Sequence, residues 1–176
     1  NEKMGFQRIL TLSIKYCELK NCKLENREFL SQATISFSSM VEFVENSQFI
    51  RQTGRFFCDG WVVYPFAANL LKSFFDKKNY AIIKNGESIE GLALFHSPHQ
   101  NEFLSISFLE AKDLIGYKKL LKHIFAFAAT EDCQEIEIML PKIPLLQQAL
   151  ADFGFSSWEQ EDDFFLYEYP LNLLQR

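Results

Sequence analysis

Two glutamates and two histidines surround one predicted strand, and they are the side chains best placed for proton transfer. The strand covers residues 102–109, with Glu102 at its start and Glu110 just after its end. His96 and His99 flank the turn that leads into it. A carboxylate or an imidazole can act as a general base when its pKa lies near the working pH. Glu110 is the first candidate and Glu102 the second, whereas an exposed turn accounts better for the histidines.

The rest of the sequence argues against several other kinds of function. Cys17, Cys22, Cys58 and Cys133 are not spaced as paired zinc ligands, so we expect no metal and four reduced thiols. Phosphate-loop, dinucleotide-binding, metalloprotease and serine-hydrolase motifs do not occur. The net charge of -5 argues against nucleic acid, and no apolar run approaches the ~18 residues of a membrane span. These features predict a cytoplasmic protein that binds neither nucleic acid nor a membrane.

Composition and periodicity predict one α+β domain. Apolar residues form 48% of the 176 residues and charged residues 23%, which is enough to build a full core. Alternating polar and apolar residues predict strands over 7–19, 29–37, 102–109 and 134–140, and a final strand pair over 155–159 and 163–169. Apolar residues at helical spacing predict helices that begin at Ser38 or Ser39, cover 67–78, begin after Asp113 as N-cap, and cover 145–153. Residues 51–60 are predicted to form a loop.

The strongest local signal is a β-hairpin over residues 80–96. Asn85-Gly86 is the favoured pair for a two-residue turn in which both central residues need a positive φ. Gly91 inside the second strand predicts a bulge or a close approach of another backbone. Strand 102–109 extends this hairpin to an antiparallel meander. The complete order from residue 29 is β-α-α-β-β-β-α-β-α-β-β, which predicts an α+β fold with a mixed sheet.

This order of elements resembles the GNAT superfamily of acyl-CoA-dependent N-acyltransferases over about residues 29–169. Residues 82–94 (IIKNGESIEGLAL) are similar to the second and third strands of that family. Residues 146–155 (LQQALADFGF) are similar to the helix before its recurrent Gly-Phe. The resemblance implies a GNAT-like, mostly antiparallel sheet with a splayed centre, flanked by helices. It also implies acetyl-CoA or another acyl-CoA as cofactor, and a small-molecule or peptide amine as acceptor.

A partial internal repeat bears on the domain organisation. Lys3-Met4-Gly5-Phe6 leads into an alternating run that ends at Tyr16, and Asp152-Phe153-Gly154-Phe155 leads into one that ends at Tyr167. The N-terminal run therefore resembles the tail of a preceding GNAT-like unit, or it is a strand that completes the sheet. The expected partner is an N-terminal GNAT-like domain or a second copy in a homodimer. The expected segments are a strand or tail (1–20), a connection (21–28) and the GNAT-like domain (29–176).

The resemblance also locates the cofactor loop. In the family a segment [Q/R]-x-x-G-x-[G/A], at the start of the helix after the fourth strand, lets backbone N–H groups bind the pyrophosphate of CoA. Counting back from the paired leucines of the next helix aligns this segment with residues 112–117. Lys112 matches the basic start, but Ile115 and Tyr117 replace small residues and Gly116 is one place out of register. The implied cofactor-binding residues are Phe108, Leu109, Lys112, Ile115, Gly116 and Tyr117.

Two further departures from the family pattern leave two hypotheses open. Asp113 puts a carboxylate at the helix N-terminus, where it takes up free N–H groups and repels an anion. Leu150 stands where many family members carry the Tyr that protonates the leaving thiolate. The first hypothesis is an N-acyltransferase in which Glu110 deprotonates the amine and a backbone N–H between Phe108 and Glu110 stabilises the oxyanion. The second is a GNAT-fold module that has lost catalysis and binds or pairs with a partner.

Overall fold

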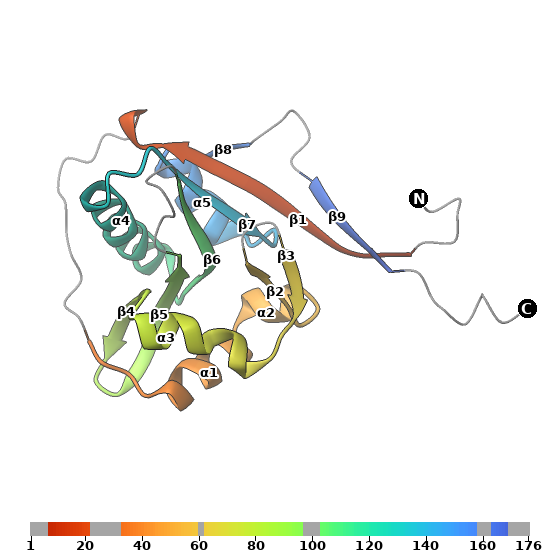
Figure 1. The fold of residues 1–176 in the computed structure, drawn as a ribbon, viewed down its shortest axis with the longest axis horizontal. Coiled ribbons are helices and arrows are strands. Elements are labelled where there is room, and N and C mark those ends of the chain that lie inside the picture. Colours follow the sequence, from red (N-terminus) through yellow and green to blue (C-terminus); the bar gives the residue numbers. More distant parts are fainter. Residues whose placement is uncertain (1–6, 22–32, 60–61, 97–102, 158–162, 169–176) are drawn as a thin grey trace, which may run out of the picture.

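The computed structural model describes residues 7–21, 33–59, 62–96, 103–157 and 163–168. Within these residues, seven strands form one sheet in the order β4-β5-β6-β7-β1-β8, with β9 also paired to β1 (Figure 1). All neighbours are antiparallel except β6 and β7, which confirms the predicted α+β class and the mostly antiparallel sheet. The strands are β1 (Gln7–Glu18), β4 (Tyr80–Asn85), β5 (Ser88–Phe95), β6 (Phe103–Ala111), β7 (Glu135–Leu140), β8 (Ser156–Ser157) and β9 (Asp163–Glu168).

Helices cover both faces of this sheet. Alternate residues of β6 point to opposite faces: Phe108 and Glu110 contact α2, whereas Ala111 faces the start of α4. A separate two-stranded sheet, β2–β3, packs beside β6. In the described part of the chain, no helix is both long and apolar enough to cross a bilayer. The remaining elements are η2 (Leu19–Asn21), α1 (Phe37–Glu45), α2 (Gln48–Gln52), β2 (Phe56–Asp59), β3 (Val62–Pro65), η3 (Ala68–Leu71), α3 (Lys72–Lys77), α4 (Leu114–Thr130) and α5 (Pro144–Asp152).

The region before the hairpin differs most from the sequence prediction. The strand predicted over 29–37 is wrong where the structure describes it: residues 33–36 have no regular structure, and Phe37 begins α1. Ser36 is the N-cap instead of Ser38 or Ser39, because its hydroxyl accepts a hydrogen bond from the N–H of Ser39 at 3.0 Å. The loop predicted over 51–60 is also wrong, since it contains the end of α2 and all of β2.

The predicted hairpin is present, with its turn moved by one residue. Asn85 pairs with Ser88, so the two turn residues are Gly86 and Glu87. Only Gly86 has a positive φ, 61°. The prediction that both Asn85 and Gly86 adopt a positive φ is therefore wrong, and one glycine is sufficient for this turn. The register shifts next to Gly91, which confirms the predicted irregularity in the second strand.

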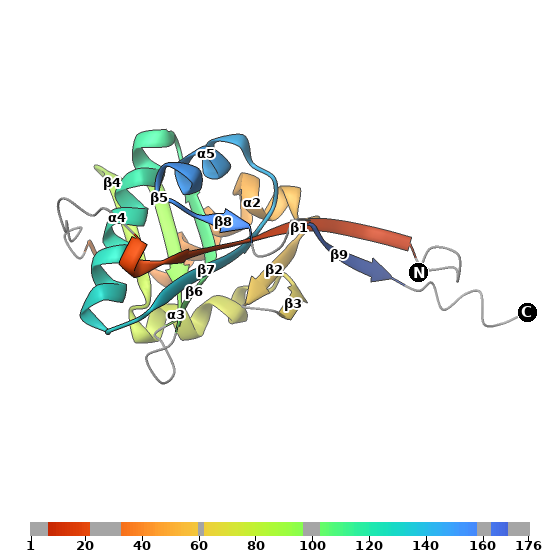
Figure 2. The ribbon, with the colours of Figure 1, turned by 90° about the horizontal axis from the view of Figure 1, so that it is seen from above.

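β1 lies inside the sheet and takes part in three pairings. One edge pairs with β7 from Ser13 to Glu18, and the other pairs with β8 and β9 (Figure 2). The two C-terminal strands therefore pair with β1 and not with each other, which corrects the predicted final strand pair. The N-terminal strand thus completes the sheet. Its descent from a preceding GNAT-like unit stays a prediction.

Candidate functional site

The two parallel strands in the middle of the sheet separate toward their carboxyl ends. β6 and β7 pair only over Phe103–Ile106 and Glu135–Ile138. β6 continues to Ala111, whereas the last two residues of β7 pair with β1. This confirms the predicted splayed centre. The separation lies beside the second half of β6, which leads directly into the start of α4.

The backbone N–H groups along β6 point alternately toward β5 and toward this separation. The N–H of Lys112 donates to the carbonyl of Glu90 in β5 at 2.9 Å. The N–H of Phe108 therefore faces β5 as well, and those of Leu109 and Ala111 face the separation. An oxyanion-binding N–H in this stretch would be that of Leu109 and not that of Phe108. The ring of Phe108 is buried, with its centroid 5.2 Å from that of Phe49.

The first turn of α4 is capped by its own sequence. Asp113 is the N-cap, as predicted, and its Oδ1 accepts a hydrogen bond from the N–H of Gly116 at 2.7 Å. A Cβ built on Gly116 would lie 2.9 Å from the Cβ of Ala111. Gly116 is therefore needed for the close approach of α4 to β6. Its N–H, which a bound phosphate would use, is already bonded to a carboxylate.

Tyr117 lies on the inner side of this turn, against β6. Its side chain is 2% exposed, and a hydrogen bond joins its hydroxyl to the backbone of Ala111. Burial, followed by the charge of Glu110, raises the pKa of Tyr117 to about 12, so the hydroxyl stays protonated at neutral pH. The ring thus stands where the family pattern has Gly or Ala. This residue and Asp113 do not fit the pyrophosphate of CoA.

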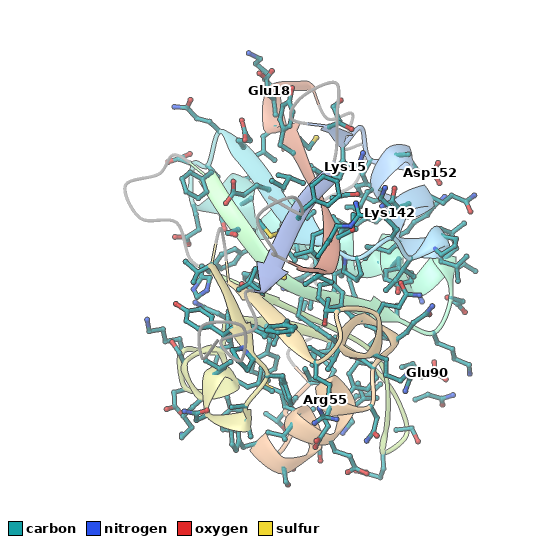
Figure 3. All side chains as sticks on the ribbon, turned by 90° about the vertical axis from the view of Figure 1, so that its right-hand side faces the viewer. Lys15, Glu18, Arg55, Glu90, Lys142 and Asp152 are labelled. Carbon is teal, nitrogen blue, oxygen red and sulfur yellow. The ribbon has the colours of Figure 1, made fainter. Side chains whose placement is uncertain are left out.

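Lys112, just before α4, and Lys118, in its second turn, are paired with carboxylates on different elements. The Nζ of Lys112 lies 2.9 Å from Glu90 Oε1, and the Nζ of Lys118 lies 2.6 Å from Asp152 Oδ2. The hydrogen bond between Lys112 and Glu90 raises the pKa of the lysine and lowers that of the glutamate. Glu90 and Asp152 lie well apart, so the two lysines do not converge on one anion (Figure 3). Ile115 is 65% exposed on the outer side of the turn.

Glu110, the first candidate for a general base, is bonded to the backbone of α2. Its Oε1 accepts the N–H of Gln48 at 2.7 Å, and its Oε2 accepts the N–H of Phe49 at 2.8 Å. The hydroxyl of Ser47 accepts the third N–H, that of Ile50, at 3.1 Å. The first three N–H groups of α2 therefore all have acceptors, and the negative charge of Glu110 lies at the favourable end of the helix.

An open pocket of about 530 Å³ lies beside Glu110. It is formed by α1, the junction of α1 and α2, the β4–β5 turn and the end of β6. The described residues that line it include no lysine or arginine, so the lining favours a cation that donates hydrogen bonds. Sequence analysis missed this pocket because its walls come from segments far apart in the chain. Its polar lining includes Ser39, Glu42, Asn46, Ser47, Glu87 and Glu110.

The other residues singled out from the sequence do not gather at this site. Leu150 is buried in the main core, where it packs and offers no proton. The ring of His96 lies 4.6 Å from that of Phe74. Burial lowers the pKa of His123 in α4. Glu102 and His99 lie outside the described residues.

The described cysteines are buried thiols outside any disulfide. Cys17, Cys58 and Cys133 form no disulfide, and burial raises the pKa of Cys58 to about 12, so it is no nucleophile at neutral pH. Cys22 lies outside the described residues. Among the residues that the structure describes, no group of three or more His, Cys, Asp or Glu side chains is arranged to hold a metal ion.

Solved structures with this architecture include GNAT proteins. A GCN5-related N-acetyltransferase from Sphaerobacter thermophilus has a TM-score of 0.57 and 12% identity, over 94% of this chain and 53% of that chain. A structure named as a GNAT-family acetyltransferase from Novosphingobium aromaticivorans DSM 12444 has a TM-score of 0.58 and 8% identity, over 94% and 68%. A functionally unknown conserved protein from Staphylococcus epidermidis ATCC 12228 has a TM-score of 0.53 and 10% identity, over 96% and 64%. No model of a known protein family and no curated protein matches the sequence.

These likenesses show that the chain has the GNAT fold, and they confirm that part of the resemblance. The chain spans about half the length of the Sphaerobacter protein, with 53% of it covered. Identities of 8–12% carry no residue roles from those proteins to this one. The roles of residues in this chain therefore depend on its own geometry.

Proposed function

We propose that this GNAT-fold chain is a binding or pairing module of a cytoplasmic, acyl-CoA-dependent N-acyltransferase. In this proposal the chain does not itself bind CoA at the usual loop. The closed first turn of α4 carries the proposal: Asp113 Oδ1 accepts the N–H of Gly116, and Tyr117 is buried against Ala111. The reaction class is supported by the two similar structures that are named as acetyltransferases.

Electrostatics at this turn oppose an incoming pyrophosphate. A helix N-terminus attracts an anion through its unpaired N–H groups and its dipole. Here the Asp113 carboxylate already occupies that position, so a phosphate would have to displace it and would be repelled by it. The pairing of Lys112 with Glu90 and of Lys118 with Asp152 partly neutralises both lysines and so weakens their attraction for a phosphate.

A thermal-shift titration with acetyl-CoA tests the proposal. A ligand present at 100 times its Kd adds about 2.7 kcal/mol to the free energy of unfolding, which raises Tm by roughly 5–10 °C in a chain of this size. We expect no change in Tm at millimolar acetyl-CoA. A GNAT enzyme known to bind acetyl-CoA is the positive control. Saturable stabilisation of this chain would refute the proposal.

The second candidate is that the chain is itself an N-acyltransferase for a small-molecule or peptide amine. The pocket beside Glu110 favours it, since a protonated amine would be attracted to Glu42 and, more weakly, to Glu87, whose Oε2 lies 3.9 Å from Lys84 Nζ. Both carboxylate oxygens of Glu110 already accept N–H groups of α2, and protonation of Glu110 would weaken these charge-assisted bonds. Release of free CoA from acetyl-CoA in the presence of a panel of amines tests this candidate. An activity that survives Glu110→Gln with an unchanged pH profile would exclude Glu110 as the base and leave Glu102.

A further inference from the structure

We draw no further inference here: the strongest candidate, the open pocket between α1, the β4–β5 turn and the end of β6, belongs to the candidate site already described.

Discussion

Glu110 can be tested as a structural tie between β6 and α2. Its two carboxylate oxygens accept the first two N–H groups of α2, a helix of only five residues. An isolated helix of this length does not form in water, so its end contacts and the packing of Phe49 and Ile50 hold it in place. Removing the carboxylate should therefore loosen α2 and lower the free energy of unfolding.

The magnitude follows from the two N–H groups that lose their acceptor. Replacing an N-terminal cap by alanine costs about 0.5–2 kcal/mol, and a hydrogen bond to a charged group contributes about 1.5–3 kcal/mol. The N–H of Gln48 is exposed and can bond to water, whereas that of Phe49 is half-buried and cannot do so fully. We therefore expect Glu110→Ala to lower the free energy of unfolding by about 2 kcal/mol, which is roughly 4–8 °C in Tm. Glu110→Gln keeps one carbonyl acceptor and should lose about half as much.

Urea unfolding and amide hydrogen exchange measure these effects. Glu42→Gln is the matched control, because Glu42 lines the same pocket but its carboxylate caps no helix, and it should change stability by less than about 0.5 kcal/mol. Exchange at Gln48 and Phe49 should become faster in Glu110→Ala, less so in Glu110→Gln, and should not change in Glu42→Gln. If Glu110→Ala unfolds like the wild type, or loses stability without faster exchange in α2, the structural role assigned to Glu110 is wrong.

Two more substitutions test the helix start and the sheet. Gly116→Ala should lower the free energy of unfolding, measured with urea, by about 1 kcal/mol. The new Cβ would lie 2.9 Å from the Cβ of Ala111, and this overpacking outweighs the gain in helix propensity. A more stable variant would contradict this packing. The pKa of Glu135 is raised, first by burial and then by the charge of Glu18, which lies opposite it in β1. The folded state therefore binds a proton more readily than the unfolded state, and the chain loses stability as pH rises through that pKa. Glu135→Gln should therefore stabilise the chain at pH 7 and lose this advantage below about pH 4, and a pH-independent difference would show that the titration of Glu135 is not its source.

Local backbone chemistry made part of this fold predictable. The hairpin of β4 and β5 was found from Asn85-Gly86 and the flanking apolar runs, since a tight turn needs a residue that tolerates a positive φ. The exact turn could not be found in this way, because the register of β5 also depends on the irregularity next to Gly91. Gly91 in turn lies where α4 comes close, with Leu120 Cδ1 3.2 Å from a built Cβ. That contact joins elements that no local pattern connects.

The candidate site depends on such distant contacts even more. Asp113 could be predicted as an N-cap, because a cap is set within three residues. Local sequence could not predict the burial of Tyr117 against Ala111 or the bonds from Glu110 to α2, since both require the packing of separate elements on β6. Ser47 in front of an apolar pair was the available signal for α2, but a helix of five residues is too short to show a periodicity.

The separation of β6 and β7 does not need a bound cofactor to persist. On one face Phe108 packs against Phe43 and Phe49, and Glu110 fixes the start of α2. On the other face Ala111 contacts the first turn of α4. The contacts of Phe108 and Glu110 with α1 and α2 involve no residue of the loop, so larger side chains at positions 115 and 117 leave these contacts intact. Similarity of fold therefore cannot decide activity here, and the first turn of α4 is where binding of CoA must be tested.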